Sequence, residues 1–192
     1  MSVPADSRDD WAALDGAAKR ARVLRVAGEL FARDGLDVPM PVLAEAIGVG
    51  VGSIYRQIGR KEDIVAALIA ERIAVVAGIF ERAVDEPDPW AALHGATFAV
   101  VAAAVDDRVT HESWAASSEH PDVLAARPRA AAALDALVDR VRAAGVLRED
   151  ATADDLRLAF RAMKDVDDLG PGGARRLAEL VLRGMRAPVH SR

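Results

Sequence analysis

The sequence predicts an all-α fold of about nine helices, arranged as a small N-terminal three-helix domain followed by a larger helical bundle. Three observations lead to this prediction. Apolar residues recur at the i, i+3, i+4, i+7 spacing of amphipathic helices along most of the chain. No alternating strand pattern persists, and Gly- or Pro-containing breaks separate the helical segments. With 52% hydrophobic and 29% charged residues, the 192-residue chain can bury a substantial core.

The N-terminal part is predicted to contain a flexible tail and one amphipathic helix. Residues 1–15 carry four Asp together with a Pro and a Trp, a composition typical of a mobile end. The segment Ala17–Asp34 places five apolar residues on one helical face, and Gly35 ends it. These five residues are Val23, Leu24, Ala27, Leu30 and Phe31.

The segment Leu43–Lys61 reads as two short helices joined by a tight turn. Each Pro in Val38-Pro39-Met40-Pro41 disfavours a helical conformation in the residue before it, so a new helix starts here, with Pro41 in its first turn. Gly48 supplies a left-handed position that ends this helix, and a second short helix runs from Val51 to Ile58. Two helices joined around a Gly are the helix-turn-helix pattern, whose second helix usually lies in the DNA major groove.

The remaining segments are predicted to form the bundle. A long helix is expected from Lys61 to about Val84, and an almost uncharged, buried helix from Trp90 to Val105. A less regular helix is expected within residues 106–118, and another starts near His120, with a break or strong kink at Pro128 and an end at Gly145. The last two helices are expected at about 153–168 and 172–187, the final one ending before Pro188.

The charge is distributed unevenly along the chain. The net charge is −5, but residues 16–61 contain eight Lys/Arg against four acids, a net of +4. Residues 62–192 contain 16 Lys/Arg against 22 acids, a net of −6. A basic front and an acidic body are typical of a DNA-binding protein with a separate second domain, although ordinary scatter of charge gives the same pattern.

An ordered set of motifs resembles the TetR family of bacterial transcription regulators. It consists of Leu30-Phe31 with Gly35, then Leu43-Ala44, Ala46-Ile47-Gly48-Val49 and Gly52-Ser53-Ile54-Tyr55, then Lys61-Glu62-Asp63-Ile64. The resemblance covers some fifty residues without a gap in the helix-turn-helix. It implies a DNA-binding domain at residues 16–62 and a ligand-binding and dimerisation domain at residues 63–192.

The resemblance implies a set of DNA-binding residues. Residues 51–53 open the recognition helix, where side chains reach base edges and N–H groups face phosphate. Tyr55 and Lys61 match positions that commonly contact the DNA backbone, and Arg56 is expected to reach a phosphate or a guanine edge. The alternatives are a packed Tyr and a helix-end Lys. The complete predicted set is Met40, Gly50, Val51, Gly52, Ser53, Tyr55, Arg56 and Lys61.

Several residues depart from the family pattern or leave their role open. Gly50 stands where a capping Ser is usual, at a cost of tenths of a kcal/mol. Met40 and Pro41 stand where a Thr or Ser usually faces phosphate, so this contact is weakened or lost. Gln57 replaces a frequent His, and Ile58 a Phe. Three arginines outside the first helix's apolar stripe form either a solvated face or phosphate contacts: Arg20, Arg22 and Arg25.

In the second domain, the resemblance implies a homodimer that pairs the helices near 153–168 and 172–187. Small residues at Ala159, Ala162, Ala178 and Gly184 fit a close approach there, or ordinary packing within one chain. A ligand pocket is expected among the middle helices. Its candidate residues, for each of which core packing is the alternative, are Phe80, Trp90, His94, Phe98, Trp114, Leu137 and Met163, with His111 and His120 as further polar candidates.

Composition and motifs exclude other classes of protein. There is no Cys, and no His/Glu spacing suited to a metal site, so neither a metal nor a cofactor is expected. No Gly-rich phosphate loop or nucleophile–base spacing indicates an enzyme. No secretion signal or membrane span is indicated, which predicts a cytoplasmic location. We therefore expect a ligand-responsive transcriptional regulator, more often a repressor in this family; the alternative is a helical small-molecule-binding protein with a decayed helix-turn-helix.

Overall fold

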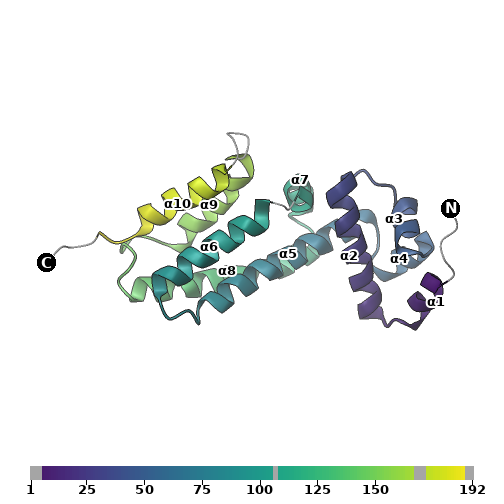
Figure 1. The fold of residues 1–192 in the computed structure, drawn as a ribbon, viewed down its shortest axis with the longest axis horizontal. Coiled ribbons are helices and arrows are strands. Elements are labelled where there is room, and N and C mark those ends of the chain that lie inside the picture. Colours follow the sequence, from purple (N-terminus) through teal and green to yellow (C-terminus); the bar gives the residue numbers. More distant parts are fainter. Residues whose placement is uncertain (1–5, 106–107, 167–171, 189–192) are drawn as a thin grey trace. The chain divides into compact units, whose positions relative to one another are not determined.

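The computed structural model describes residues 6–105, 108–166 and 172–188, and these residues form ten α-helices. The prediction of an all-α fold is confirmed, with one helix more than expected. Figure 1 labels the helices: α1 Asp6–Ala13, α2 Gly16–Asp34, α3 Met40–Ile47, α4 Val51–Gln57, α5 Lys61–Ala83, α6 Pro89–Val105, α7 Arg108–Ser117, α8 Pro121–Ala143, α9 Ala153–Val166 and α10 Gly173–Met185. Across the described ranges, no helix is both long and apolar enough to span a membrane.

The chain divides into two compact units. The amino-terminal unit comprises residues 1–72 together with 108–125, and the bundle unit comprises residues 73–107 and 126–192. The sequence predicted a tail at residues 1–15 and domains at residues 16–62 and 63–192, and this division into functional domains stays a prediction. The amino-terminal unit extends further because α7 packs on α2, a contact between segments far apart in sequence.

The additional helix, α1, lies within residues 1–15, which were predicted to be a flexible tail. The helix is linked to α2 by two contacts. Arg22 Nη1 of α2 donates to Asp10 Oδ2 at 2.9 Å, and Lys19 Nζ lies 6.0 Å from the centroid of the Trp11 ring. These two contacts hold α1 against α2, although the composition of residues 1–15 by itself favours a flexible terminus.

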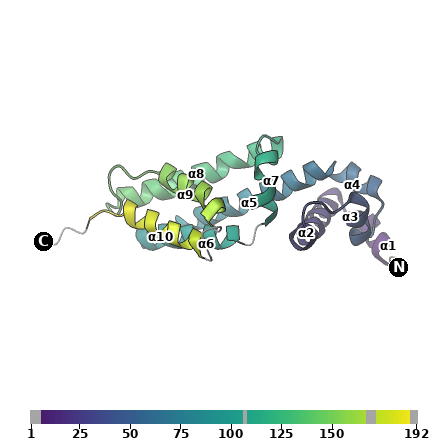
Figure 2. The same ribbon diagram turned by 90° about the horizontal axis from the view of Figure 1, so that it is seen from above.

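The first three helices after α1 pack as the sequence predicts. All five predicted stripe residues of α2 are buried, and α3 and α4 both pack against this helix (Figure 2). The buried residues of α3 and α4 include Leu43, Ile47 and Ile54, which are at most 1% exposed. Burying such an aliphatic side chain contributes about 1.5–3 kcal/mol, so this small core fixes the angle between the short helices.

Helix α8 runs without interruption from Pro121 to Ala143, although a break or kink was expected at Pro128. A Pro inside a helix removes the hydrogen bond to the carbonyl four residues earlier, here that of Leu124. One of the two expectations, a new helix beginning at Pro128, was wrong, and the other, a strong kink, stays a prediction.

The bundle unit buries its apolar residues in two clusters. The larger cluster joins the bundle's parts of α5 and α8 with α6, α9 and α10, and includes Leu93, Leu137, Val141, Leu156 and Leu182. The smaller one lies where α6, α9 and α10 meet, around Ala159, Met163 and Ala178. Helix α10 lies beside both α9 and α6 (Figures 1 and 2).

Candidate nucleic-acid interface

The turn between α3 and α4 has the predicted geometry. Gly48 adopts a left-handed conformation with φ 84° and ψ 29°, and its N–H donates to the carbonyls of Ala44 and Glu45. The N–H of Val49 also donates to the Ala44 carbonyl, at 2.9 Å. A side chain at position 48 is strained at this φ, so glycine is what allows α3 to end and α4 to begin within three residues.

Helix α4 starts without a side-chain cap. Gly50 occupies the N-cap position in an extended conformation, with φ −77° and ψ 147°, and no side chain bonds to the first turn. The first turn is closed by the backbone bond from Ser53 N to the Gly50 carbonyl, at 2.8 Å. In the same helix, Arg56 Nη2 donates to Ser53 Oγ at 3.2 Å. With Gly50 in place of a capping side chain, the start of α4 carries no bulky polar group.

Two long-range bonds hold the short helices on α2. Gln57 Nε2, at the end of α4, donates to the Gly16 carbonyl at 2.6 Å. Arg22 Nη2 donates to the Ile47 carbonyl at the end of α3, at 3.1 Å. Sequence reasoning did not identify either bond, because the partners lie 41 and 25 residues apart.

The residues predicted to bind DNA all lie in the amino-terminal unit, within α3, the turn, α4 and the first residue of α5. Gly50, Gly52, Tyr55 and Arg56 are exposed, and the remaining four are half-buried: Met40, Val51, Ser53 and Lys61. Lys61 Nζ lies 5.7 Å from the centroid of the buried Phe31 ring, which holds its stem against α2. The ammonium group can still reach an anion because the residue is only half-buried.

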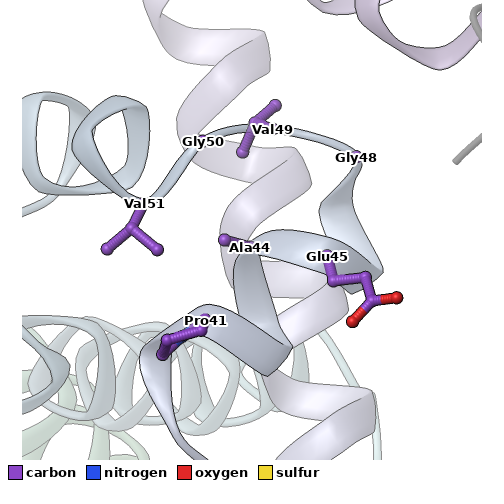
Figure 3. A pocket seen from close by; sticks show the side chains of 7 residues that line it. All are labelled: Pro41, Ala44, Glu45, Gly48, Val49, Gly50 and Val51. Atoms are coloured by element: carbon purple, nitrogen blue, oxygen red, sulfur yellow. The ribbon is translucent and has the colours of Figure 1, made fainter. Parts of the chain in front are cut away.

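A groove of about 320 Å³ lies along α3, the turn and the start of α4 (Figure 3). It is lined by Pro41, Ala44, Glu45, Gly48, Val49, Gly50 and Val51. Only Gly50 and Val51 of these seven belong to the predicted DNA-binding set. Pro41 and Glu45 are exposed residues one helical turn apart on α3, a spacing that could have indicated a shared face.

The three arginines of α2 whose role was left open are each paired with a carboxylate. Arg22 pairs with Asp10, Arg25 with Glu29 at 3.0 Å, and Arg20 with Asp122 at 3.5 Å. Arg22 is the least exposed of them and also bonds to α3, so its role is structural. The pairs of Arg20 and Arg25 are largely exposed and contribute little to stability.

The start of α5 is fixed by Asp63. Its Oδ2 accepts the Arg60 N–H at 2.6 Å, as an acidic residue does in a helix cap, and its Oδ1 lies 3.2 Å from Nε2 of His120. The Arg60 N–H, and secondly the His120 ring, lower the pKa of the Asp63 carboxyl below its ordinary value. Asp63 thus joins the loop after α4 to the residue that precedes α8.

We expect Asp63→Asn to reduce the acid sensitivity of the folded protein. A carboxyl whose pKa is lowered by folding stabilises the folded state above its unfolded pKa, near 4, and this contribution is lost as pH falls through the folded value. Because the Asp63 side chain is 40% exposed, the effect should stay below about 1 kcal/mol. Urea unfolding of both proteins from pH 6 to pH 2.5 measures it; parallel curves would contradict the assignment.

Most of the candidate ligand-pocket residues lie in the bundle unit, where Trp90 and Phe98 pack against the cluster that holds Phe80 and Leu137. Phe80, Leu137 and Met163 are buried in the clusters of the bundle unit. Trp90, His94 and Phe98 form a half-buried row along α6, with ring centroids 6.2 Å and 4.6 Å apart. Arg186 and Arg175 lie over the two ends of this row, 4.6 Å from the Trp90 ring and 5.0 Å from the Phe98 ring. Trp114 belongs to the amino-terminal unit, as does His120; the side chain of His111 lies outside the described residues.

The small residues of the last two helices have different environments. Ala159 and Ala178 are buried between α9 and α10 of the same chain. Ala162 is half-buried and Gly184 is exposed. Close to them on the surface, Leu158 and Leu180 are 70% and 55% exposed, the two highest values among large hydrophobic residues in the described ranges. The exposed surface of α9 and α10 thus carries two large apolar side chains among charged residues such as Asp154, Arg161 and Arg176.

A search of the described residues finds no group of three or more His, Cys, Asp or Glu side chains arranged to hold a metal ion. The site built by α3, the turn and α4 consists of hydrogen-bonding, cationic and apolar surface groups.

Comparison with known proteins relates this site to one family. A sequence profile of bacterial regulatory proteins of the tetR family matches residues 23–68, which span α2, α3, α4 and the start of α5. A comparison with curated proteins gave no match. Many solved structures of regulators with this fold are similar to the chain.

Three solved structures illustrate the similarity. A TetR transcription regulatory protein from Mycobacterium vanbaalenii is 26% identical, with 90% of this chain and 98% of that chain covered and a TM-score of 0.64. A TetR transcriptional regulator from Streptomyces coelicolor is 27% identical, with 88% and 99% covered and a TM-score of 0.66. SmeT, the repressor of a multidrug efflux pump of Stenotrophomonas maltophilia, shares the fold at 20% identity, with 92% and 94% covered and a TM-score of 0.66.

Proposed function

We propose that this chain, which belongs to the TetR family of bacterial regulators, is a repressor that binds a pseudo-palindromic operator as a homodimer and is released by a small-molecule effector. The family assignment supplies the general role of a DNA-binding transcriptional regulator. The repressor role, the symmetric operator and the release by ligand are the proposal.

The observation that carries the proposal is the construction of α3 and α4. The left-handed Gly48 and the bonds of Gln57 and Arg22 hold two short helices rigidly on α2. Their outer face presents Tyr55 and Arg56 to solvent, with Lys61 at the start of the next helix. A hydroxyl and two cations beside an exposed, rigid helix suit phosphate contacts on either side of a major groove.

The homodimer is supported by two exposed leucines, one on α9 and one on α10. Leu158 and Leu180 expose apolar surface that pairing of α9 and α10 with those of a second copy would remove from water. Symmetric pairing of two protomers would present two recognition helices to two half-sites, whose centres lie about 34–36 Å apart, one turn of the DNA helix. The row of Trp90, His94 and Phe98 on α6 is the candidate binding site for an effector in the bundle unit. A bound effector would favour arrangements of the two protomers that do not match the spacing of the half-sites.

We expect Lys61→Ala to weaken binding to every DNA sequence by a similar factor and to lower the salt dependence. Removing one phosphate contact reduces the slope of log K against log salt by about one. Gel retardation and fluorescence anisotropy on the promoter fragments of the source genome, from 50 to 300 mM salt, provide the measurement. Arg82→Ala, an exposed cation in the last turn of α5 within the bundle unit, is the matched control and should leave the slope unchanged.

The same experiment tests the proposal as a whole. Wild-type protein should retard particular promoter fragments in preference to others at moderate salt, and Tyr55→Phe should weaken this binding by about tenfold through loss of one hydrogen bond to a charged phosphate. Equal retardation of all fragments, or wild type and Tyr55→Ala behaving alike, would overturn the proposed function.

A further inference from the structure

The groove between α3 and α4 has a chemical character that the proposed function does not by itself explain. Six of its seven lining residues have no polar side-chain atom: Pro41, Ala44, Gly48, Val49, Gly50 and Val51. The seventh, Glu45, has a carboxylate that points away from Val51 in Figure 3. The part of the groove between Pro41 and Val51, with Ala44 as its floor, is therefore apolar.

This groove faces away from the core of the amino-terminal unit. Leu43, Ile47 and Ile54 are buried on the side of α3 and α4 that packs against α2. The groove instead contains exposed positions, namely Pro41, Glu45 and Gly50. It thus lies on the surface where the helix-turn-helix would meet the floor of a major groove.

The lining determines which base edges the groove can accept. Guanine is usually recognised by an Arg or Lys that donates to its O6 and N7, and adenine by an Asn or Gln. None of the seven lining residues has a side-chain donor. A guanine or adenine edge pressed against the apolar part of the groove, between Pro41 and Val51, would lose hydrogen bonds to water without replacement. The C5-methyl group of thymine needs only an apolar contact.

We infer that this groove reads the C5-methyl groups of thymines in the operator, with Val51 and Pro41 as the residues that determine specificity. The inference rests on the proposed function, because it assigns the base preference of the same DNA-binding surface. Val51 is half-buried and held by the first turn of α4, and Pro41 is rigid, so both offer a methyl group a fixed apolar contact.

The test uses duplex DNA that differs only by methyl groups. Wild-type protein first selects its preferred site from a random duplex library. Each thymine of that site is then replaced by deoxyuridine, which lacks only the C5-methyl group. At one or two positions in each half-site, the replacement should weaken binding about fourfold, as expected for one buried methyl group. Cytosine replaced by 5-methylcytosine at other positions should show no comparable gain.

Two variants assign the effect to the groove. Val51→Ala and Pro41→Ala should each weaken binding to the selected duplex. At the thymine that each residue contacts, the affinity for the thymine duplex divided by that for the deoxyuridine duplex should fall close to one. Val42→Ala is the matched control, because Val42 is 44% exposed on the same helix but does not line the groove. This variant should keep the wild-type ratio.

The outcomes separate the two proposals. If the library yields no enriched sequence, the proposed function fails and the inference fails with it. If a site is enriched but no thymine position distinguishes deoxyuridine, the proposed function stands and methyl reading by the groove is overturned. If wild type distinguishes thymine from deoxyuridine and both Val51→Ala and Pro41→Ala still do so, the methyl group is contacted by another part of the protein. The assignment of base preference to the groove is then overturned. The wild-type comparison needs no variant, so it holds even if a substitution unfolds the protein.

Discussion

Replacing both Leu158 and Leu180 with Glu is expected to convert the proposed dimer into a monomer and to reduce operator affinity by more than about 100-fold. Both residues expose large apolar side chains, 70% and 55% respectively, on the pair of helices proposed to form the dimer. Two carboxylates on each protomer would place four negative charges in the symmetric interface. Affinity falls this far because, in a dimer, binding of one protomer holds the second protomer close to the other half-site, and a monomer loses this high effective concentration.

The measurement is sedimentation equilibrium of wild type and the double variant, followed by anisotropy with the selected operator. Val75→Glu is the matched control, because Val75 is an exposed Val of the bundle unit on α5 rather than on α9 or α10. It should remain a dimer and keep its DNA affinity. A double variant that stays dimeric, with an unchanged circular dichroism spectrum, would show that the dimer forms through another surface.

Gly59→Ala is expected to destabilise the protein by about 2–4 kcal/mol. Gly59 has φ 119°, a conformation that costs a side-chain-bearing residue about 1–3 kcal/mol. A Cβ at this position would also clash with Oδ2 of Asp63. Asp63 would have to leave its bond to the Arg60 N–H, so the variant loses the cap of α5, typically worth about 1 kcal/mol.

Urea unfolding at pH 7 measures this loss. Gly28→Ala is the control in the same unit, because Gly28 lies inside α2 and its added Cβ would meet Leu68 Cδ2 at an ordinary 3.5 Å. That variant should gain about 0.5–1 kcal/mol, since Ala is the better helix former. A Gly59→Ala protein as stable as wild type would mean that the loop after α4 does not need this conformation.

The parts of the fold that sequence predicts well are those fixed by local periodicity. The apolar stripe of α2 and the left-handed turn at Gly48 each depend on residues within a few positions of one another. The chemistry of Gly and the 3.6-residue period are sufficient to define them. Pro128 shows the limit of local rules, because a single Pro within a long packed helix did not end it.

What the sequence left undetermined depends on contacts between distant segments. Asp63 and His120 are in contact although they lie 57 positions apart in the sequence. Gln57 and Gly16, which are joined by a hydrogen bond, lie 41 positions apart. The groove could not be read from the sequence either, because its apolar character arises only when Pro41 of α3 and Val51 of α4 face the same space. Of the seven candidate pocket residues, only Trp114 lies in the amino-terminal unit, because α7 packs on α2, whereas the other six lie in the bundle unit.

The central claim, that this chain reads DNA as a symmetric dimer through α3 and α4, is tested most directly by selection from a random duplex library with the full-length protein. We predict enrichment of an inverted repeat whose half-sites lie about one helical turn apart, with two protomers bound to each duplex in sedimentation experiments. A pool that remains random after repeated selection at moderate salt, or a selected site bound by a single protomer, would contradict the claim.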